Sequence, residues 1–453
     1  MAINPSLLFL SLLLLFNGCL ARQTFSSQQF QNECQINRLH AFAPQTRIRS
    51  EAGTTEWWNP NSQQLRCAGV SVMRQTIEPN GLVLPSFTNA PQLLYIVQGR
   101  GIQGIVMPGC AETFQDSQQW QHQSRGRFQD QHQKIRRFRQ GDIIALPQGV
   151  VHWSYNDGNE RVVTINLLDT GNSANQLDNI PREEEQGRES SSCNNLLCAF
   201  DRNFLAQAFN VDQDVIRKIQ RVRGNRGTII RVRDRLQVVT PPRMEEEERE
   251  ERQQEQRYRR TRGGSQDNGL EETFCSMRIK ENLADPERAD IFNPQAGRIS
   301  TLNRFNLPIL QRLELSAERG VLYNRAGLIP QWNVNAHKIL YMLRGCARVQ
   351  VVNHNGDAVF DDNVEQGQLL TVPQNFAFMK QAGNEGAEWI SFFTNSEATN
   401  TPMAGSVSFM RALPEEVVAA SYQVSREDAR RIKFNNKNTF FFTPSQSERR
   451  ADA

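Results

Sequence analysis

The chain contains little lysine, little histidine and no long apolar segment. Lys accounts for 7 and His for 6 of its 453 residues. No stretch approaches 18 consecutive apolar residues, so the sequence predicts no membrane-spanning helix. The net charge is only +3, since 52 Lys and Arg residues are balanced by 49 Asp and Glu residues. This balance disfavours a dedicated nucleic-acid-binding protein and a polybasic membrane-surface protein.

Several sequence patterns that accompany enzymatic chemistry are also missing. We find no Gly-rich phosphate-binding loop, no Ser-His-Asp order and no Cys-His nucleophile context. The adjacent carboxylates Asp361 and Asp362 would point apart on a strand, so they predict no acid–base couple. The cysteines lack the paired C-x-x-C spacing of common structural zinc sites.

Nitrogen-rich side chains are abundant. The chain has 45 Arg and 42 Gln residues. Solvation alone does not require this bias, because Lys is hydrated at least as well as Arg. The composition therefore favours a protein selected for its nitrogen content, with Arg-rich ion-pair networks as the alternative explanation.

The N-terminal region has the features of a secretory signal. Residues 7–16 form a ten-residue run that is apolar except for Ser11 and is too short to span a bilayer. Cys19 and Ala21 then occupy the positions that signal peptidase prefers. We therefore predict a signal peptide that is cleaved between Ala21 and Arg22. The mature chain would enter an oxidising compartment, where cysteines can form disulfides.

The sequence contains an internal repeat. Three pairs of segments match in order: 91–99 with 337–345, 141–147 with 367–373, and 205–219 with 418–432. Duplication of a unit of about 180 residues is the simplest explanation. Each unit has short apolar runs separated by Gly, Pro and Asn turns, followed by a helical pattern with Asp212 or Ser425 as N-cap. The sequence therefore predicts a mainly β protein with two tandem jelly-roll β-barrels, each with a helical arm.

A charged segment separates the two repeats. Residues 243–268 are rich in Glu and Arg and have no apolar stripe to bury, which predicts a flexible linker. The expected divisions are a signal peptide (1–21), a first domain with its arm (22–242), the linker (243–268), a second domain with its arm (269–445) and a flexible tail (446–453).

One segment has the spacing of the second cupin motif. Its five members are Gly141, Pro147, Gly149, His152 and Asn156. In metal-binding cupins this His is a ligand, and the first motif adds two His and a Glu. Here Gln92 occupies the Glu position, and residues 86–89 contain no His. One imidazole is too few for a first-row metal centre, which needs three or four ligands.

The second repeat has even fewer candidate ligands. Lys338 occupies the Glu position, Gln331 and Asn333 lie where the His pair would be, and Phe378 replaces the His of the second motif. We therefore predict no metal, no cofactor and no catalytic residue in either barrel. The two domains are interpreted as cupin barrels with vestigial sites.

Longer stretches resemble the legumin-type (11S) seed storage globulins of the cupin superfamily. The matching segments are 89–101, 109–114, 268–282 and 289–302, and the Asn-Gly-x-Glu-Glu-Thr-x-Cys sequence that starts at Asn268 is the most specific. The resemblance implies a seed storage protein that travels through the secretory pathway to the protein storage vacuole. It also implies a homo-oligomer, trimeric as precursor and hexameric when mature. Asparaginyl endopeptidase would be the processing enzyme, cutting between Asn268 and Gly269.

The resemblance further implies two disulfides. They are Cys34–Cys67 and Cys110–Cys275, and the second would hold the two processed chains together. Cys193 and Cys198 depart from the family pattern, and whether they pair stays open. Cys346 lies in a strand pattern and is expected to be a buried free thiol.

Two other functions remain as alternatives to storage. One is a small-ligand-binding protein with two cupin domains, and the other is a metal-dependent cupin enzyme. The enzyme would need the His and Glu ligands that are missing. No nucleic-acid or membrane partner is expected.

Overall fold

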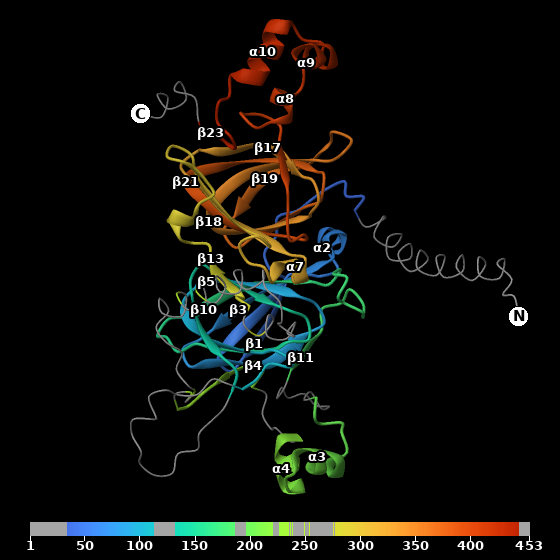
Figure 1. Ribbon diagram of the computed structural model, residues 1–453, viewed down its shortest axis with the longest axis vertical. Helices are drawn as coiled ribbons and strands as arrows, with labels where there is room; N and C mark the ends of the chain where they lie inside the picture. The colour runs from blue at the N-terminus through green and yellow to red at the C-terminus, as the bar shows by residue number, and fades with distance from the viewer. Residues whose placement is uncertain are drawn as a thin grey trace, which may run out of the picture.

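The computed structural model describes residues 34–112, 132–185, 196–220, 226–234 and 277–443, with the single positions 236, 238, 249, 253 and 275. Two β-barrels are stacked along the long axis of the molecule, and a helical arm projects at each end (Figure 1). The predicted mainly β fold with two barrels and two helical arms is confirmed. The predicted signal peptide with Ala21 and Arg22, most of the linker, the Asn268–Gly269 bond and the C-terminal tail lie outside the described residues.

The first barrel is built from two antiparallel sheets. One has the strand order β1 (Thr46–Ser50), β2 (Gly53–Trp57), β3 (Val70–Ile77), β10 (Val162–Asp169), β5 (Gln92–Gln98), β8 (Asp142–Leu146) and β13 (Lys280–Asn282). The other has the order β11 (Glu183–Glu185), β4 (Gly81–Thr88), β9 (Val151–Tyr155), β6 (Arg100–Val106) and β7 (Ile135–Arg139), and β12 (Ile229–Arg231) also pairs with β4.

Two strands of the second barrel, of 15 and 17 residues, are longer than any strand described in the first barrel. Its main path is β14 (Ile291–Asn293), β15 (Gly297–Leu302), β16 (Ser316–Leu322), β21 (Ala377–Phe393), β17 (Gly327–Asn333) and β22 (Asn400–Pro402). The strand β18 (Lys338–Val352) pairs with β21 and also with β19 (Ala358–Glu365) and β20 (Leu369–Val372), while β23 (Phe441–Phe442) pairs with β17.

Each arm consists of short helices, and Asp201, Ser408 and Ser425 provide polar N-caps for three of them. The first arm has α3 (Arg202–Phe209) and α4 (Gln213–Gln220), and the second has α8 (Phe409–Ala412), α9 (Glu415–Tyr422) and α10 (Arg426–Phe434). Ser425 caps α10 as predicted, because its hydroxyl accepts a hydrogen bond from the Asp428 amide at 3.1 Å. Two further helices, α2 (Gln63–Ala68) and α7 (Leu310–Leu313), and a 3₁₀ turn (Pro286–Arg288) lie in loops. Within the described ranges, none of the helices is long and apolar enough to cross a membrane.

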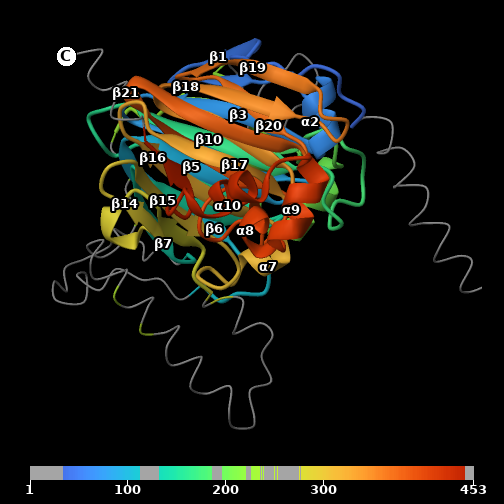
Figure 2. The ribbon, with the colours of Figure 1, turned by 90° about the horizontal axis from the view of Figure 1, so that it is seen from above.

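One apolar cluster extends from the first barrel across its contact with the second, and the interior of the second barrel forms a separate cluster. Alternation along β18 places Leu340 and Met342 inside the second barrel, whereas Ile339 and Tyr341 pack in the same core as residues of the first barrel. Tyr341 meets Trp58 edge to face, with ring centroids 5.9 Å apart. Figure 2 shows strands of both barrels running in layers one above the other. The barrels are therefore packed directly against each other rather than linked only by the chain.

Each barrel also contains a segment from the other half of the sequence. The strand β13 follows the linker, yet it pairs with β8 in the first barrel, with Lys280 opposite Ile144. Conversely, the N-terminal segment lies on the second barrel, where the Leu39 amide donates to the Val359 carbonyl at 2.8 Å. The packing therefore crosses the predicted domain boundary at residue 269.

Both disulfides implied by the family resemblance are present. Cys34 is bonded to Cys67 and Cys110 to Cys275, with Cα separations of 4.7 Å and 5.5 Å. Cys198 is also disulfide-bonded. Cys346 is a free thiol but is half-buried rather than buried, because it lies where β18 changes its pairing on β21.

Candidate functional site

The cupin motif of the first barrel forms a turn and the strand that follows it. Gly141 and Gly149 have φ angles of 89° and 70°, which favour glycine. Pro147 follows the end of β8. His152 lies on β9 opposite Ser86 of β4, and only 6% of its surface is exposed. The motif therefore places its imidazole in the interior, as it would in a metal-binding cupin.

The His152 imidazole is held by polar neighbours of the protein itself. The Gln92 amide nitrogen lies 3.4 Å from Nε2, and the Val150 carbonyl lies 3.3 Å from Nδ1. These contacts fit a neutral ring that accepts from Gln92 and donates to Val150. Burial lowers the pKa of His152 to about 4, so the ring is uncharged at neutral pH.

Asn156, the last member of the motif, has a structural role. Its side chain is fully buried. Nδ2 donates to the carbonyls of Ile77 at 3.0 Å and Glu160 at 2.8 Å, and Oδ1 accepts from the Gly158 amide at 3.0 Å. These bonds fix the turn after β9 and engage both polar atoms of the Asn156 side chain.

The centre of the second barrel contains a buried ionic cluster instead of metal ligands. Nζ of Lys338 lies 3.0 Å from Oε1 of Glu318, and the Trp389 indole donates to the same oxygen at 3.0 Å. Lys380 lies with its Nζ 3.4 Å from the centroid of the Trp389 ring. All four side chains are at most 5% exposed.

The charges of this cluster are shaped by burial and by each other. Burial, together with the charge of Lys338, holds the pKa of Lys380 well below its usual range. Burial opposes ionisation of Glu318, but the charges of Lys338 and Lys380 nevertheless lower its pKa. The arrangement therefore favours a Lys338–Glu318 ion pair and disfavours the charged form of the neighbouring Lys380.

The register of the second barrel confirms which positions correspond to the first. Gln331 of β17 lies opposite Phe378 of β21, as Ser86 lies opposite His152. Gln331 and Asn333 are buried, and within the described structure the Gln331 Oε1 and both Asn333 amide atoms have no hydrogen-bond partner. The positions of the metal ligands are thus occupied by amides, a lysine and a phenylalanine.

These residues do not fit the metal that the cupin fold carries in its metal-binding members. A lysine ammonium repels a cation, and a phenyl ring offers no ligand atom. His152 has no carboxylate or second imidazole beside it among the residues described. Within all the described residues, one group of three possible His, Cys, Asp or Glu ligands is found, and it consists of Cys34, Cys67 and His337. We therefore derive no metal-dependent step from either barrel.

Sequence reasoning located some of these residues and missed others. It placed Lys338 and Gln92 at the Glu positions, and the structure places both in the barrel interiors. It did not find Glu318 or Lys380, because neither belongs to a motif and each lies on a different strand from Lys338. No isolated charge marked either residue, because Glu318 is followed by Arg319 and β21 carries Glu385 and Glu388 besides Lys380.

Comparisons with known proteins place this geometry in a family. The Cupin family model matches residues 39–217 and 281–430. The chain is 87% identical to Legumin A of Gossypium hirsutum, over the whole length of both proteins. The crystal structure of the coconut allergen cocosin superposes with a TM-score of 0.81 at 45% identity, covering 91% of this chain and all of that one. Recombinant pro-11S globulin of pumpkin gives 0.80 at 41% identity, with the same coverage.

The matches extend over nearly the whole chain and include both barrels. The chain therefore belongs to the legumin-type 11S seed storage globulins of the cupin superfamily.

Proposed function

We propose that this seed storage globulin serves as a nitrogen reserve without enzymatic activity. The observation that carries the proposal is the content of the two barrel centres, where Gln92 binds His152 and Glu318 binds Lys338. These side chains bond to one another at the positions where a catalytic cupin would hold a metal. The 45 Arg and 42 Gln residues supply the stored nitrogen.

The proposed life cycle has a trimeric precursor, one proteolytic cut and a mature hexamer. Asparaginyl endopeptidase cuts between Asn268 and Gly269 in the protein storage vacuole of the seed, and the cut permits two trimers to associate. The disulfide between Cys110 and Cys275 supports this order of events, because it keeps the two products covalently joined.

Exposed apolar side chains on the helical arms support the oligomer. In the first arm Phe204 is 72% exposed and Phe209 53%. In the second arm Tyr422 and Phe434 are 51% and 42% exposed. Side chains of this size gain free energy when a neighbouring protomer covers them. Arms at both ends of the protomer suit a closed ring in which each arm packs on the next subunit.

Replacement of the proposed cleavage residue tests the life cycle. An Asn268→Gln precursor treated with asparaginyl endopeptidase should stay one chain and stay trimeric, whereas the wild type yields two disulfide-linked chains and hexamers. Sedimentation velocity and N-terminal sequencing provide the readout.

A matched control is available in a second Asn-Gly pair. Asn355–Gly356 lies in the turn between β18 and β19, where the Asn353 side chain accepts from the amides of Asn355 and Asp357. Asn355→Gln should be processed like the wild type. Cleavage of Asn268→Gln at the same bond, or hexamers of uncut protein, would contradict the proposal.

A further inference from the structure

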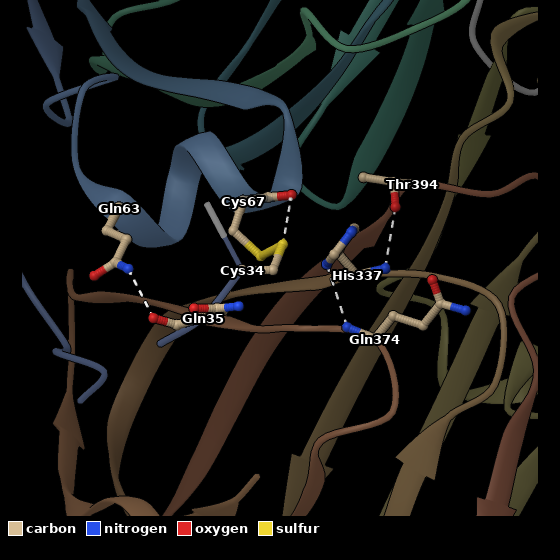
Figure 3. The surroundings of a disulfide bond; sticks show 7 residues. All are labelled: Cys34, Gln35, Gln63, Cys67, His337, Gln374 and Thr394. Atoms are coloured by element: carbon tan, nitrogen blue, oxygen red, sulfur yellow. Dashed lines mark hydrogen bonds between the residues drawn. A yellow bond between two sulfur atoms is a disulfide. The ribbon is translucent and has the colours of Figure 1, made fainter. Parts of the chain in front are cut away.

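Two bonded cysteines and one histidine from distant parts of the chain lie together outside the barrel centres. Cys34 belongs to the N-terminal segment, Cys67 to α2, and His337 directly precedes β18. One candidate ligand atom from each residue lies within 4.8 Å of the other two. Figure 3 shows the imidazole beside the disulfide. Two sulfurs and an imidazole nitrogen form a ligand set typical of zinc once the sulfurs are thiolates.

The His337 ring is held in a form that can bind a metal. The backbone N–H of Gln374 donates to Nδ1 of His337 at 3.2 Å, so Nδ1 carries the lone pair and Nε2 carries the proton. The His337 amide donates to Oγ1 of Thr394 at 3.0 Å, which fixes the backbone that carries the ring. A metal ion bound at Nδ1 would replace a single hydrogen bond.

The two cysteines are held near each other by more than their disulfide. The Gln64 side chain accepts from the His40 amide at 3.1 Å and donates to the His40 carbonyl at 3.0 Å. Gln63 donates to the Gln35 carbonyl at 3.0 Å. Ile36 is buried in the same apolar cluster as Cys67. These contacts keep the N-terminal segment on α2 when the sulfurs are no longer bonded.

We propose that reduction of the Cys34–Cys67 disulfide creates a zinc site whose protein ligands are the two thiolates and the His337 imidazole. A dithiol reductant transfers two electrons and two protons to the disulfide and itself becomes a disulfide. The zinc ion then displaces one proton from each thiol, and both protons pass to solvent. Water completes the four-coordinate shell.

The geometry allows this change with side-chain movement alone. In tetrahedral coordination, zinc bonds of ordinary length set neighbouring S and N ligand atoms about 3.5–3.8 Å apart. The three atoms already lie within 4.8 Å of one another, and the two Cα atoms are 4.7 Å apart. Cys34 and His337 are half-buried rather than buried, so a reductant and an ion can reach the site from solvent.

The second disulfide provides a control within the same molecule. Cys110 and Cys275 are also bonded, but they belong to no three-residue group of metal ligands in the described structure. Reduction there yields two thiols without an imidazole. The proposal therefore predicts a difference between two reduced cysteine pairs under the same conditions.

Cobalt spectroscopy and thiol mapping test the proposal on the full-length protein. After reduction with a phosphine, Co²⁺ should produce a thiolate-to-metal charge-transfer band that the oxidised protein lacks and that Zn²⁺ abolishes. In the reduced protein, Zn²⁺ should slow alkylation of Cys34 and Cys67 by about tenfold or more while Cys110 and Cys275 react as before.

Two histidine variants separate coordination from a general effect of reduction. His337→Gln should weaken zinc binding by about tenfold or more, whereas His354→Gln, an exposed histidine elsewhere on the barrel, should leave it unchanged. The proposal is overturned by the absence of the cobalt band in reduced protein, by equal protection of both cysteine pairs, or by unchanged affinity in His337→Gln. Because mapping uses the wild type, the test does not depend on how a cysteine variant folds.

Discussion

Lys338 and Glu318 form a direct ion pair inside the second barrel, with Nζ and Oε1 3.0 Å apart and side-chain exposures of 0% and 5%. Lys338 stands where a metal-binding cupin has its glutamate ligand, so a cation of the protein occupies the place of the metal. Taking both charges out of water costs free energy, and their attraction offsets this only while both partners are present. The pair therefore makes the barrel sensitive to loss of either residue.

Glu318→Gln should destabilise the protein by about 3–5 kcal/mol, because it leaves the buried Lys338 charge without its partner. Glutamine has a similar shape and can still accept from the Trp389 indole, so the loss reports on charge. The free energy of unfolding from denaturant titration provides the measurement. The double variant Glu318→Gln with Lys338→Met should recover most of the loss. Equal destabilisation in single and double variants would show that charge is not the cause.

Asp169→Asn should stabilise the protein more at pH 8 than at pH 5. Burial raises the pKa of Asp169 to about 7, far above its ordinary 3.8, and Glu314 adds to this shift. The unfolded carboxyl ionises readily while the folded one resists, so the wild type loses stability as the pH rises. The gain from Asn should be about 2 kcal/mol larger at pH 8. Asn can still accept the hydrogen bond that Asn172 donates at 3.0 Å.

His152→Phe should remove part of the loss of stability in acid. The folded pKa of about 4 lies below the ordinary value of 6.5. The unfolded state therefore binds the proton first, and the contribution of His152 is present above pH 6.5 and is lost as the pH falls toward 4. Between pH 7 and pH 4.5 the wild type should lose about 2 kcal/mol more than the variant. Parallel stability curves for the two proteins would contradict this assignment.

Loss of the Cys110–Cys275 bond should affect cut and uncut protein differently. In the uncut chain, the Cys110→Ser/Cys275→Ser variant should lose about 5 kcal/mol, because the bond closes a loop across a sequence separation of 165 residues. After cleavage, the same variant should release two separate chains in non-reducing denaturing gels. The Cys34→Ser/Cys67→Ser variant is the control, and its cut product should remain joined.

Local sequence patterns were sufficient to predict the repeated parts of the fold. The glycines at 141 and 367 mark equivalent turns, with φ angles of 89° and 84°. Ser425 caps the helix that was predicted to follow it. In both cases the relevant interactions occur within a few residues, so the signal is contained in adjacent positions of the sequence.

Contacts between distant residues could not be predicted in the same way. His337 lies about 300 residues from Cys34 in sequence, and Lys380 shares no motif with Lys338. Residues 34–42 lie on the second barrel and residues 280–282 pair with the first. Both placements depend on packing and backbone pairing of short stretches that carry no sequence motif. Such pairings require the three-dimensional arrangement, because many segments of similar composition compete for the same sheet edge.

The strand β13 has a consequence for how the mature protein can unfold and refold. Once the chain is cut at the proposed bond, Lys280–Asn282 belongs to a different polypeptide from the sheet that it completes at β8. Refolding then becomes the association of two fragments, governed by their effective concentration rather than by chain connectivity. With the Cys110–Cys275 bond intact, that concentration stays high and the strand returns to its place. When the bond is reduced, dilution separates the fragments, and unfolding of the cut protein becomes a one-way step.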